Sequence, residues 1–142
     1  MLEIVYYFDK ISCLCPVKKY LEKYISKEAG CEEKMEKKKR ILISIREKIE
    51  FVRQNEGRPL PPISSSLHGY SFFEIRARKD KNILIRITYF RHDCKMVLLN
   101  AFEKPDNYET NRDKKLVEKQ LMVADTYYKN FKLNPESYER YN

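Results

Sequence analysis

The spacing of hydrophobic positions changes along the chain, and each change predicts a different element. Residues 3–8 form a short apolar and aromatic run, which is typical of a β-strand entering a sheet. Pro16 then opens a stretch with apolar residues at intervals of three and four, and Gly30 closes it. The apolar positions are Val17, Tyr20, Leu21, Tyr24 and Ile25. We therefore expect a strand followed by a helix.

A second helical pattern covers residues 32–54. Its apolar stripe consists of Met35, Leu42, Ile45, Ile49 and Val52. The opposite face carries four consecutive basic residues, 37–40. Two helices joined by a short glycine-containing turn predict a helical hairpin. Residues 57–66 contain three prolines and three serines and continue neither a helix nor a central strand, so they connect the hairpin to the strand-like region after them.

Three strand-like runs come next, separated by the polar turns 79–82 and 91–94. They cover residues 72–78, 83–90 and 95–102. Such short turns predict an antiparallel meander. In the first run, apolar and charged side chains alternate between the two faces of the strand. Phe73, Ile75 and Ala77 share one face, and Glu74, Arg76 and Arg78 share the other.

A last helix is expected over residues 111–131, and residues 132–142 have the composition of a loose tail. The helical stripe is Val117, Leu121, Ala124, Tyr128 and Phe131. The predicted order is strand, helix, helix, three antiparallel strands, helix. This is an α+β fold in a single domain, 1–142, with its core at about residues 3–131. We expect the helices on one sheet face and a concave, basic surface on the other.

Composition adds a positive field to this picture. The chain has 29 Lys and Arg and 21 Asp and Glu, which gives a formal net charge of +8. A positive field of this size attracts RNA, DNA, ribosomes or acidic proteins. The four cysteines, Cys13, Cys15, Cys31 and Cys94, lack the paired spacing of a metal site, so we expect reduced thiols and no metal or cofactor. The sequence has neither a signal-peptide pattern nor an apolar run of membrane length, which favours a cytoplasmic protein and no membrane partner.

Four segments of the chain carry a resemblance to a known family. They are IVYYFDK with CPVKKYLEKY (4–10 and 15–24), LHGYSFFEIR (67–76), IRITYF (85–90) and VLLNAFEK (97–104). In this order and spacing they resemble the motifs of the RelE/ParE toxin superfamily, and most closely its HigB-like branch, which includes phage-derived members. The similarity covers roughly residues 3–131.

The resemblance implies a RelE-like fold and the toxin half of a type II toxin–antitoxin pair. HigB-like toxins cut messenger RNA, usually in the ribosomal decoding site, and a small antitoxin, typically with a helix-turn-helix domain, neutralises them. The implied partners are therefore an antitoxin, mRNA and the ribosome. This chain departs from the pattern at three positions. Pro105 follows Lys104 where a second lysine is frequent, Asn100 replaces a common histidine, and Tyr70 replaces a leucine.

Cleaving RNA without a metal requires a base for the 2′-hydroxyl, an acid for the leaving 5′-oxygen and cations for the phosphorane. Arg76 and Arg86, which match arginines of the family motifs, are the expected phosphate clamps. Lys104 is expected to stabilise charge or donate a proton, and Tyr108 to stack on a base or act as the acid. The alternatives are structural: an Arg76–Glu74 pair, a buried ion pair of Arg86, and solvated surface positions for Lys104 and Tyr108.

Further cations are candidates for holding the RNA backbone. They are Arg78, Arg91, Lys37, Lys38, Lys39 and Arg40, and for the last four a solvated helix face is the alternative. The two histidines are not assigned to catalysis, since His92 lies in a turn and His68 precedes Gly69 in a motif turn. Two other functions stay open. One is a ParE-like toxin that inhibits DNA gyrase, and the other is a catalytically degenerate RNA-binding or repressor subunit.

Overall fold

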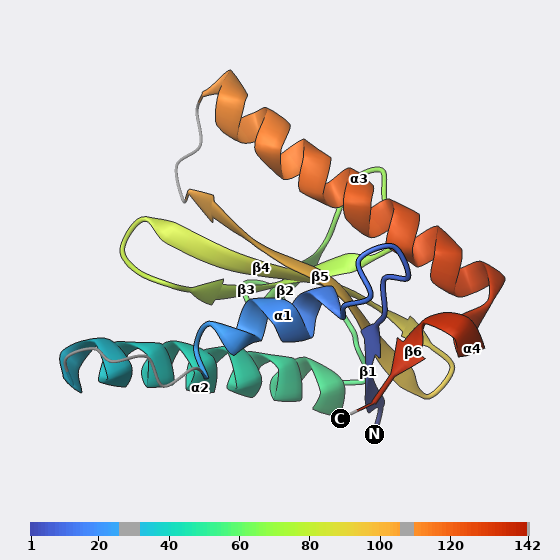
Figure 1. Ribbon diagram of the computed structural model, residues 1–142, viewed down its shortest axis with the longest axis horizontal. Coiled ribbons are helices and arrows are strands. Elements are labelled where there is room, and N and C mark those ends of the chain that lie inside the picture. Colours follow the sequence, from blue (N-terminus) through green and yellow to red (C-terminus); the bar gives the residue numbers. More distant parts are fainter. Residues whose placement is uncertain (26–31, 106–109, 142) are drawn as a thin grey trace.

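The computed structural model describes residues 1–25, 32–105 and 110–141, which form a mixed α+β structure around one twisted sheet (Figure 1). Within these ranges the strands are β1 (Glu3–Tyr7), β2 (Ser64–Ser66), β3 (Phe73–Arg78), β4 (Ile83–His92), β5 (Lys95–Pro105) and β6 (Glu139–Arg140). The helices are α1 (Pro16–Glu22), α2 (Glu32–Gln54), α3 (Asn111–Leu133) and α4 (Pro135–Tyr138).

The sheet has the strand order β2-β3-β4-β5-β1-β6. Its centre is the predicted antiparallel meander β3-β4-β5. Each of these strands begins and ends within a few residues of its predicted bounds. Strand β1 pairs in parallel with β5, with Val5 opposite Val97, and the other described pairings are antiparallel. The sheet therefore joins the first strand of the chain to a hairpin made about 90 residues later, which is a long-range contact.

The helices begin where local chemistry favours them. Pro16 occupies the first turn of α1, where a missing backbone N–H costs no hydrogen bond. Thr110 caps α3 because its side-chain oxygen accepts a hydrogen bond from the Asp113 backbone N–H at 3.2 Å. Helix α2 has the predicted bounds, and buried residues such as Ile45 and Val52 face the sheet.

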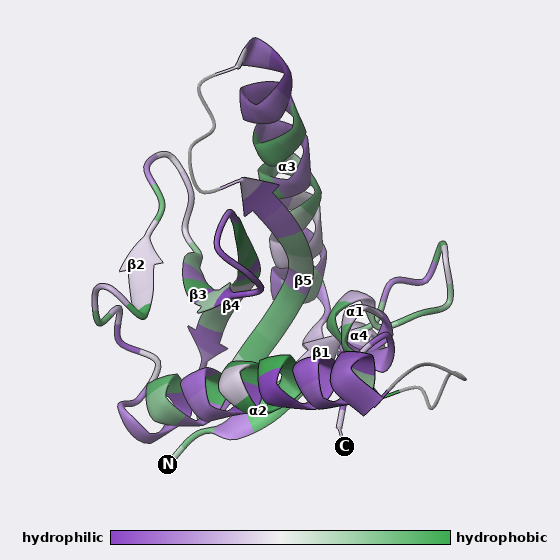
Figure 2. Cartoon of the chain, turned by 90° about the vertical axis from the view of Figure 1, so that its left-hand side faces the viewer, coloured by the Kyte–Doolittle hydropathy of each residue, from purple (hydrophilic) through white to green (hydrophobic). Residues whose placement is uncertain are grey.

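Two apolar cores lie on opposite faces of the sheet, and this corrects one expectation. Helices α1 and α2 cover one face, where Val17, Leu21 and Ile45 belong to the same core as Ile87. Helix α3 covers the other face, where Leu121 belongs to the same core as Phe90 and Val97 (Figures 1 and 2). We expected helices on a single face. They cover both because β1, β4 and β5 carry apolar side chains on both faces, each of which must be buried.

Other corrections concern element ends. Helix α1 ends at Glu22 rather than near Gly30, and Ile25 and Met35, which we placed in apolar stripes, are exposed. The expected connection 57–66 contains the short edge strand β2, and the expected turn 91–94 contracts to Asp93 and Cys94 because β4 and β5 are longer than predicted. Helices α1 and α2 both pack on one sheet face, but the turn expected between them lies outside the described residues.

The end of the chain is not a loose tail. It forms α4 and β6, and β6 extends the sheet beside β1, with Glu139 opposite Tyr7. The ring of Tyr138 stacks on Tyr7 with 5.3 Å between centroids, and Lys95 Nζ lies 2.7 Å from a Glu139 oxygen. Low hydrophobicity predicted disorder here, whereas a free edge of β1 and an aromatic stack hold the segment in place. Within the described ranges, none of the helices combines the length and apolar character that a membrane span requires.

Candidate functional site

The polar side chains of interest project from the sheet toward α3. In the β3–β4 ladder Arg76 lies directly opposite Arg86, and Glu74 opposite Thr88. In the β4–β5 ladder Arg86 lies opposite Phe102, which belongs to the core under α3. Because directly opposed residues share a face, these two arginines are neighbours on the α3 side of the sheet. The alternation in β3 predicted that Arg76 and Glu74 share a face, but not that α3 covers it.

Glu74 lies between the two guanidinium groups. Its side chain is 1% exposed, one carboxylate oxygen accepts a hydrogen bond from Arg76 Nε at 3.1 Å, and the other lies 3.0 Å from Arg86 Nη1. Arg76 also donates to the Ser65 hydroxyl at 2.6 Å and to the Pro62 carbonyl at 3.4 Å. The structural alternatives for both arginines are therefore confirmed: each forms an internal ion pair with the same buried carboxylate.

These ion pairs nevertheless border open space. A pocket of about 650 Å³ lies between the segment 66–68, strands β3 and β4, and the first half of α3. Glu74, Arg76 and Arg86 line it from the sheet. Both arginines therefore border the pocket although each already has a carboxylate partner, and Arg76 is the more exposed of the two, with 32% of its side chain accessible against 9% for Arg86.

Besides Ser66, three charged or titratable residues complete the polar lining of this pocket. His68 comes from the segment before β3, and Lys114 and Glu118 come from α3; all three are exposed. Val117 and Leu121 of α3 supply an apolar wall. The arrangement combines two guanidinium groups held by Glu74, which suits an anion, with an imidazole that can accept or donate a proton.

The pocket was only partly foreseen from the sequence. His68 was not assigned to catalysis, and Lys114 and Glu118 were not predicted as site residues. Their contribution depends on how α3 docks on the sheet, and α3 follows β3 by more than 30 residues. The LHGYSFFEIR segment did carry a usable signal, because it places His68 only eight residues before Arg76.

Lys104 differs from its expected place. It is 8% exposed, lies opposite Leu84, and is not among the described residues that line this pocket. Lys104 is therefore neither a solvated lysine nor a catalytic group at the pocket wall. Its side chain is buried in the cross-strand pair next to that of Arg86 on the same sheet face. Tyr108, the other expected catalytic residue, lies outside the described residues.

The expected RNA-binding cations do not form one surface. Arg78 shares the α3 side with Arg76 and donates to the Lys81 carbonyl at 3.0 Å in the β3–β4 turn. Arg91 is near the opposite end of β4, with Nη1 3.7 Å from Glu56. Residues 37–40, that is Lys37, Lys38, Lys39 and Arg40, are on α2, across the sheet from the pocket. One RNA strand in the pocket does not contact all of these groups.

Asn100, which replaces the family histidine, has a structural position in β5. It is buried, its side-chain oxygen accepts a hydrogen bond from Thr88 Oγ1, and its Nδ2 donates to the Gln120 carbonyl at 3.0 Å. Asn100 therefore fastens α3 to the sheet beside the pocket. His92 packs edge-on against Phe131 with 5.3 Å between centroids, so it is a packed side chain rather than a plain surface histidine.

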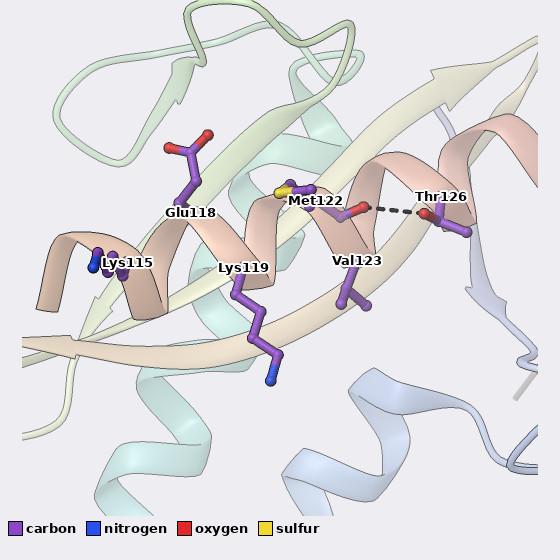
Figure 3. Close-up of a pocket in the computed structure, with 6 residues that line it drawn as sticks. All are labelled: Lys115, Glu118, Lys119, Met122, Val123 and Thr126. Carbon is purple, nitrogen blue, oxygen red and sulfur yellow. Dashed lines mark hydrogen bonds between the residues drawn. The ribbon is translucent and has the colours of Figure 1, made fainter. Parts of the chain in front are cut away.

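A smaller hollow of about 360 Å³ lies on the outer surface of α3 (Figure 3). Its described lining comes from this helix alone: Lys115, Glu118, Lys119, Met122, Val123 and Thr126. Lys119 and Val123 extend to the same side of the helix, and the Thr126 hydroxyl donates to the Met122 carbonyl at 3.2 Å. Since the described residues bring no group from another element to this hollow, we assign it no chemistry.

The residues that the structure describes contain no group of three or more His, Cys, Asp or Glu arranged to hold a metal ion. No family model matches the chain, and comparison with curated proteins and with solved structures gives no significant match. Membership of the RelE/ParE superfamily therefore stays a prediction from the four motifs.

Proposed function

We propose that this protein is a RelE-like, HigB-like toxin of a type II toxin–antitoxin pair and that it cleaves messenger RNA. One observation carries the proposal: Arg76, Arg86, Lys114 and His68 meet at one open pocket above the meander. The four sequence motifs and the order of elements support the same interpretation, since a strand and two helices precede the antiparallel strands and a long helix follows them.

The proposed reaction uses the RNA's own 2′-hydroxyl and no metal. The scissile phosphate lies against Arg76 and Arg86, whose guanidinium groups stay charged throughout. His68 takes the 2′-hydroxyl proton, the 2′-oxygen bonds to phosphorus, and the bond to the 5′-oxygen breaks. Lys114 donates the proton that the leaving oxygen needs. The products are a 2′,3′-cyclic phosphate and a 5′-hydroxyl, and DNA is not cut because it lacks the nucleophile.

Glu74 sets the strength of this site. Its charge offsets one of the two guanidinium charges. Its hydrogen bond from Arg76 and its ion pair with Arg86 keep both groups oriented before substrate arrives. A weakened field predicts slow cleavage of free RNA. The ribosome would raise the rate by holding the message in register with the pocket, and this is the reason to propose a ribosome-dependent activity in the cytoplasm with a neutralising antitoxin as partner.

A second function is favoured by a different observation. The Nε, Nη1 and Nη2 atoms of Arg76 all donate to protein acceptors, and Lys104 is buried away from the pocket. Because the donors of Arg76 already bind protein acceptors, the site also suits a catalytically degenerate RNA-binding or repressor subunit. This candidate predicts RNA binding without strand scission.

The deciding experiment supplies the purified chain with ribosomes programmed with a defined message, and in parallel with the same RNA alone. Mapping of new 5′ ends detects cleavage, and filter binding detects retention without cleavage. Cleavage lost in both His68→Ala and Lys114→Ala supports the toxin. The matched control, Lys119→Ala on the outer surface of α3, should cleave normally.

Binding without cleavage would select the degenerate subunit instead. Intact messages together with growth arrest and a DNA-damage response on expression would select a ParE-like gyrase inhibitor and refute both RNA functions.

A further inference from the structure

A second pocket, of about 330 Å³, lies across the sheet from the first, on the α1 and α2 side. Tyr24 and Ile41, each 7% exposed, form its apolar floor. The described cations around it are Lys23, Lys34, Lys37, Lys38 and Lys79. They come from the end of α1, from the first half of α2 and from the β3–β4 turn, three parts of the chain that the fold brings together (Figure 1).

Two of these lysines are held by one carboxylate. Lys23 Nζ and Lys79 Nζ lie 3.0 and 2.9 Å from the two oxygens of Glu103, which also accepts a hydrogen bond from the Tyr20 hydroxyl at 2.8 Å. Lys34 and Lys37 are exposed and form no ion pair within residues 1–25, 32–105 and 110–141. The rim therefore keeps positive charge available to a ligand.

The combination of floor and rim specifies the chemistry of a ligand. A bulky apolar group that covers the apolar floor removes it from water, which makes binding more favourable. The methylene stems of the lysines extend the same apolar surface. Ammonium groups at the edge pair with carboxylates. We propose that this pocket binds an acidic segment of a partner protein, with one large apolar side chain on Tyr24 and Ile41 and carboxylates on Lys34 and Lys37.

A protein segment fits these features better than a nucleic acid does. The described cations at the pocket are all lysines, whereas bidentate recognition of phosphate favours arginine. Helix α2 carries Glu32 and Glu33 in its first turn, so its N-terminus does not attract a phosphate. The sheet separates this pocket from Arg76 and Arg86, and the inference is therefore independent of the proposed RNA cleavage.

The test is fluorescence anisotropy with the full chain and a labelled short peptide of Asp and Glu around a central Phe. Replacing the Phe of the peptide by Ala should weaken binding about tenfold, because a single buried anchor carries much of such an interface. Charge reversal at the rim, Lys34→Glu with Lys37→Glu, should weaken binding by about tenfold or more. The milder pair Lys34→Ala with Lys37→Ala should fall between this variant and the wild type.

The matched control is Lys115→Glu with Lys119→Glu on α3, which makes the same change in net charge on the opposite side of the sheet. It should bind the peptide within about twofold of wild type. An equal loss of peptide affinity in this control would mean general charge attraction and would overturn the proposal. Equal affinity for the Phe and Ala peptides would overturn it as well. Tighter binding of an RNA oligonucleotide of equal charge, lost in the Lys34/Lys37 variants, would reassign the pocket to nucleic acid.

Discussion

Arg86 Nη1 lies 3.0 Å from a carboxylate oxygen of Glu74, and both side chains are almost fully buried. Taking two charges out of water costs free energy that their attraction must offset, and removing one partner leaves the other uncompensated. The pair therefore matters to the fold as well as to the pocket. It also sets a condition on function, because any phosphate that approaches Arg86 competes with a carboxylate already in contact.

The first prediction concerns this carboxylate. Glu74→Gln removes the negative charge that both Arg76 and Arg86 contact, so the free energy of unfolding should fall by about 3 kcal/mol. Urea denaturation followed by circular dichroism measures the change. The exposed carboxyl of Glu118 in the same pocket provides the control, because Glu118→Gln should change stability by less than about 0.5 kcal/mol. Similar small effects for both variants would contradict a structural role of Glu74.

The second prediction concerns catalysis. If His68 is the base, His68→Ala should reduce the rate of RNA cleavage about 100-fold, which is typical of losing a positioned general base. Binding of RNA should persist because the guanidinium groups are unchanged. Rates from gel-resolved cleavage and affinities from filter binding separate the two effects. His92→Ala, at the packed histidine, serves as comparison, and a normal rate in His68→Ala would exclude this residue as the base.

A third prediction concerns acid stability. Although burial raises the pKa of Glu103, hydrogen bonds from Lys79, Lys23 and Tyr20 lower it to about 2. Since the folded pKa is below the ordinary value of 4.5, this group stabilises the fold above about pH 4.5, and the stabilisation is lost as pH falls toward 2. With allowance for partial exposure, the contribution is about 2 kcal/mol.

The measurement compares unfolding of the wild type and Glu103→Gln across this pH range. The stability difference between them should shrink on acidification, because the wild-type carboxyl becomes neutral as well. A constant difference from pH 7 to pH 2 would mean that the carboxylate is not held by these three hydrogen bonds.

The fourth prediction addresses the end of the chain. Tyr138→Ala removes the ring that stacks on Tyr7, and stability should fall by about 1–2 kcal/mol. Differential scanning calorimetry would record a lower Tm. Leu133→Ala, at a side chain that is 85% exposed, should leave the Tm unchanged. Equal behaviour of the two variants would show that α4 and β6 do not anchor the sheet edge.

How much the sequence predicts differs between elements for physical reasons. The meander and α2 were predicted closely because each carries a strict period of its own, 2 in β3 and about 3.6 in α2. The packing of α3 on the second sheet face was not predicted. Phe90 and Tyr89 are buried on opposite sides of one strand, so both faces of the sheet require a covering layer. Strand β6 has only two residues, too few for a hydrophobic period, and it forms by pairing with the distant β1. Its sequence alone therefore does not predict it.

The same distinction applies to the candidate site. The closeness of Arg76 and Arg86 follows from their motifs, and Glu74 was already a possible partner of Arg76 from the alternation. His68 and Lys114 join them only through tertiary docking of a loop and of α3. Tertiary docking also brings Lys23, Lys34 and Lys79 together at the second pocket, and no local pattern connects these three residues.

The pairing of β1 has a consequence for synthesis in the cell. Its neighbours in the sheet, β5 and β6, are translated about 90 and 130 residues after it. While the polypeptide is still emerging, β1 has neither of these partners, so it joins the sheet only after residues 95–105 have been translated. A messenger broken ahead of the codons for β5 would therefore yield a product in which β1 has no partner strand.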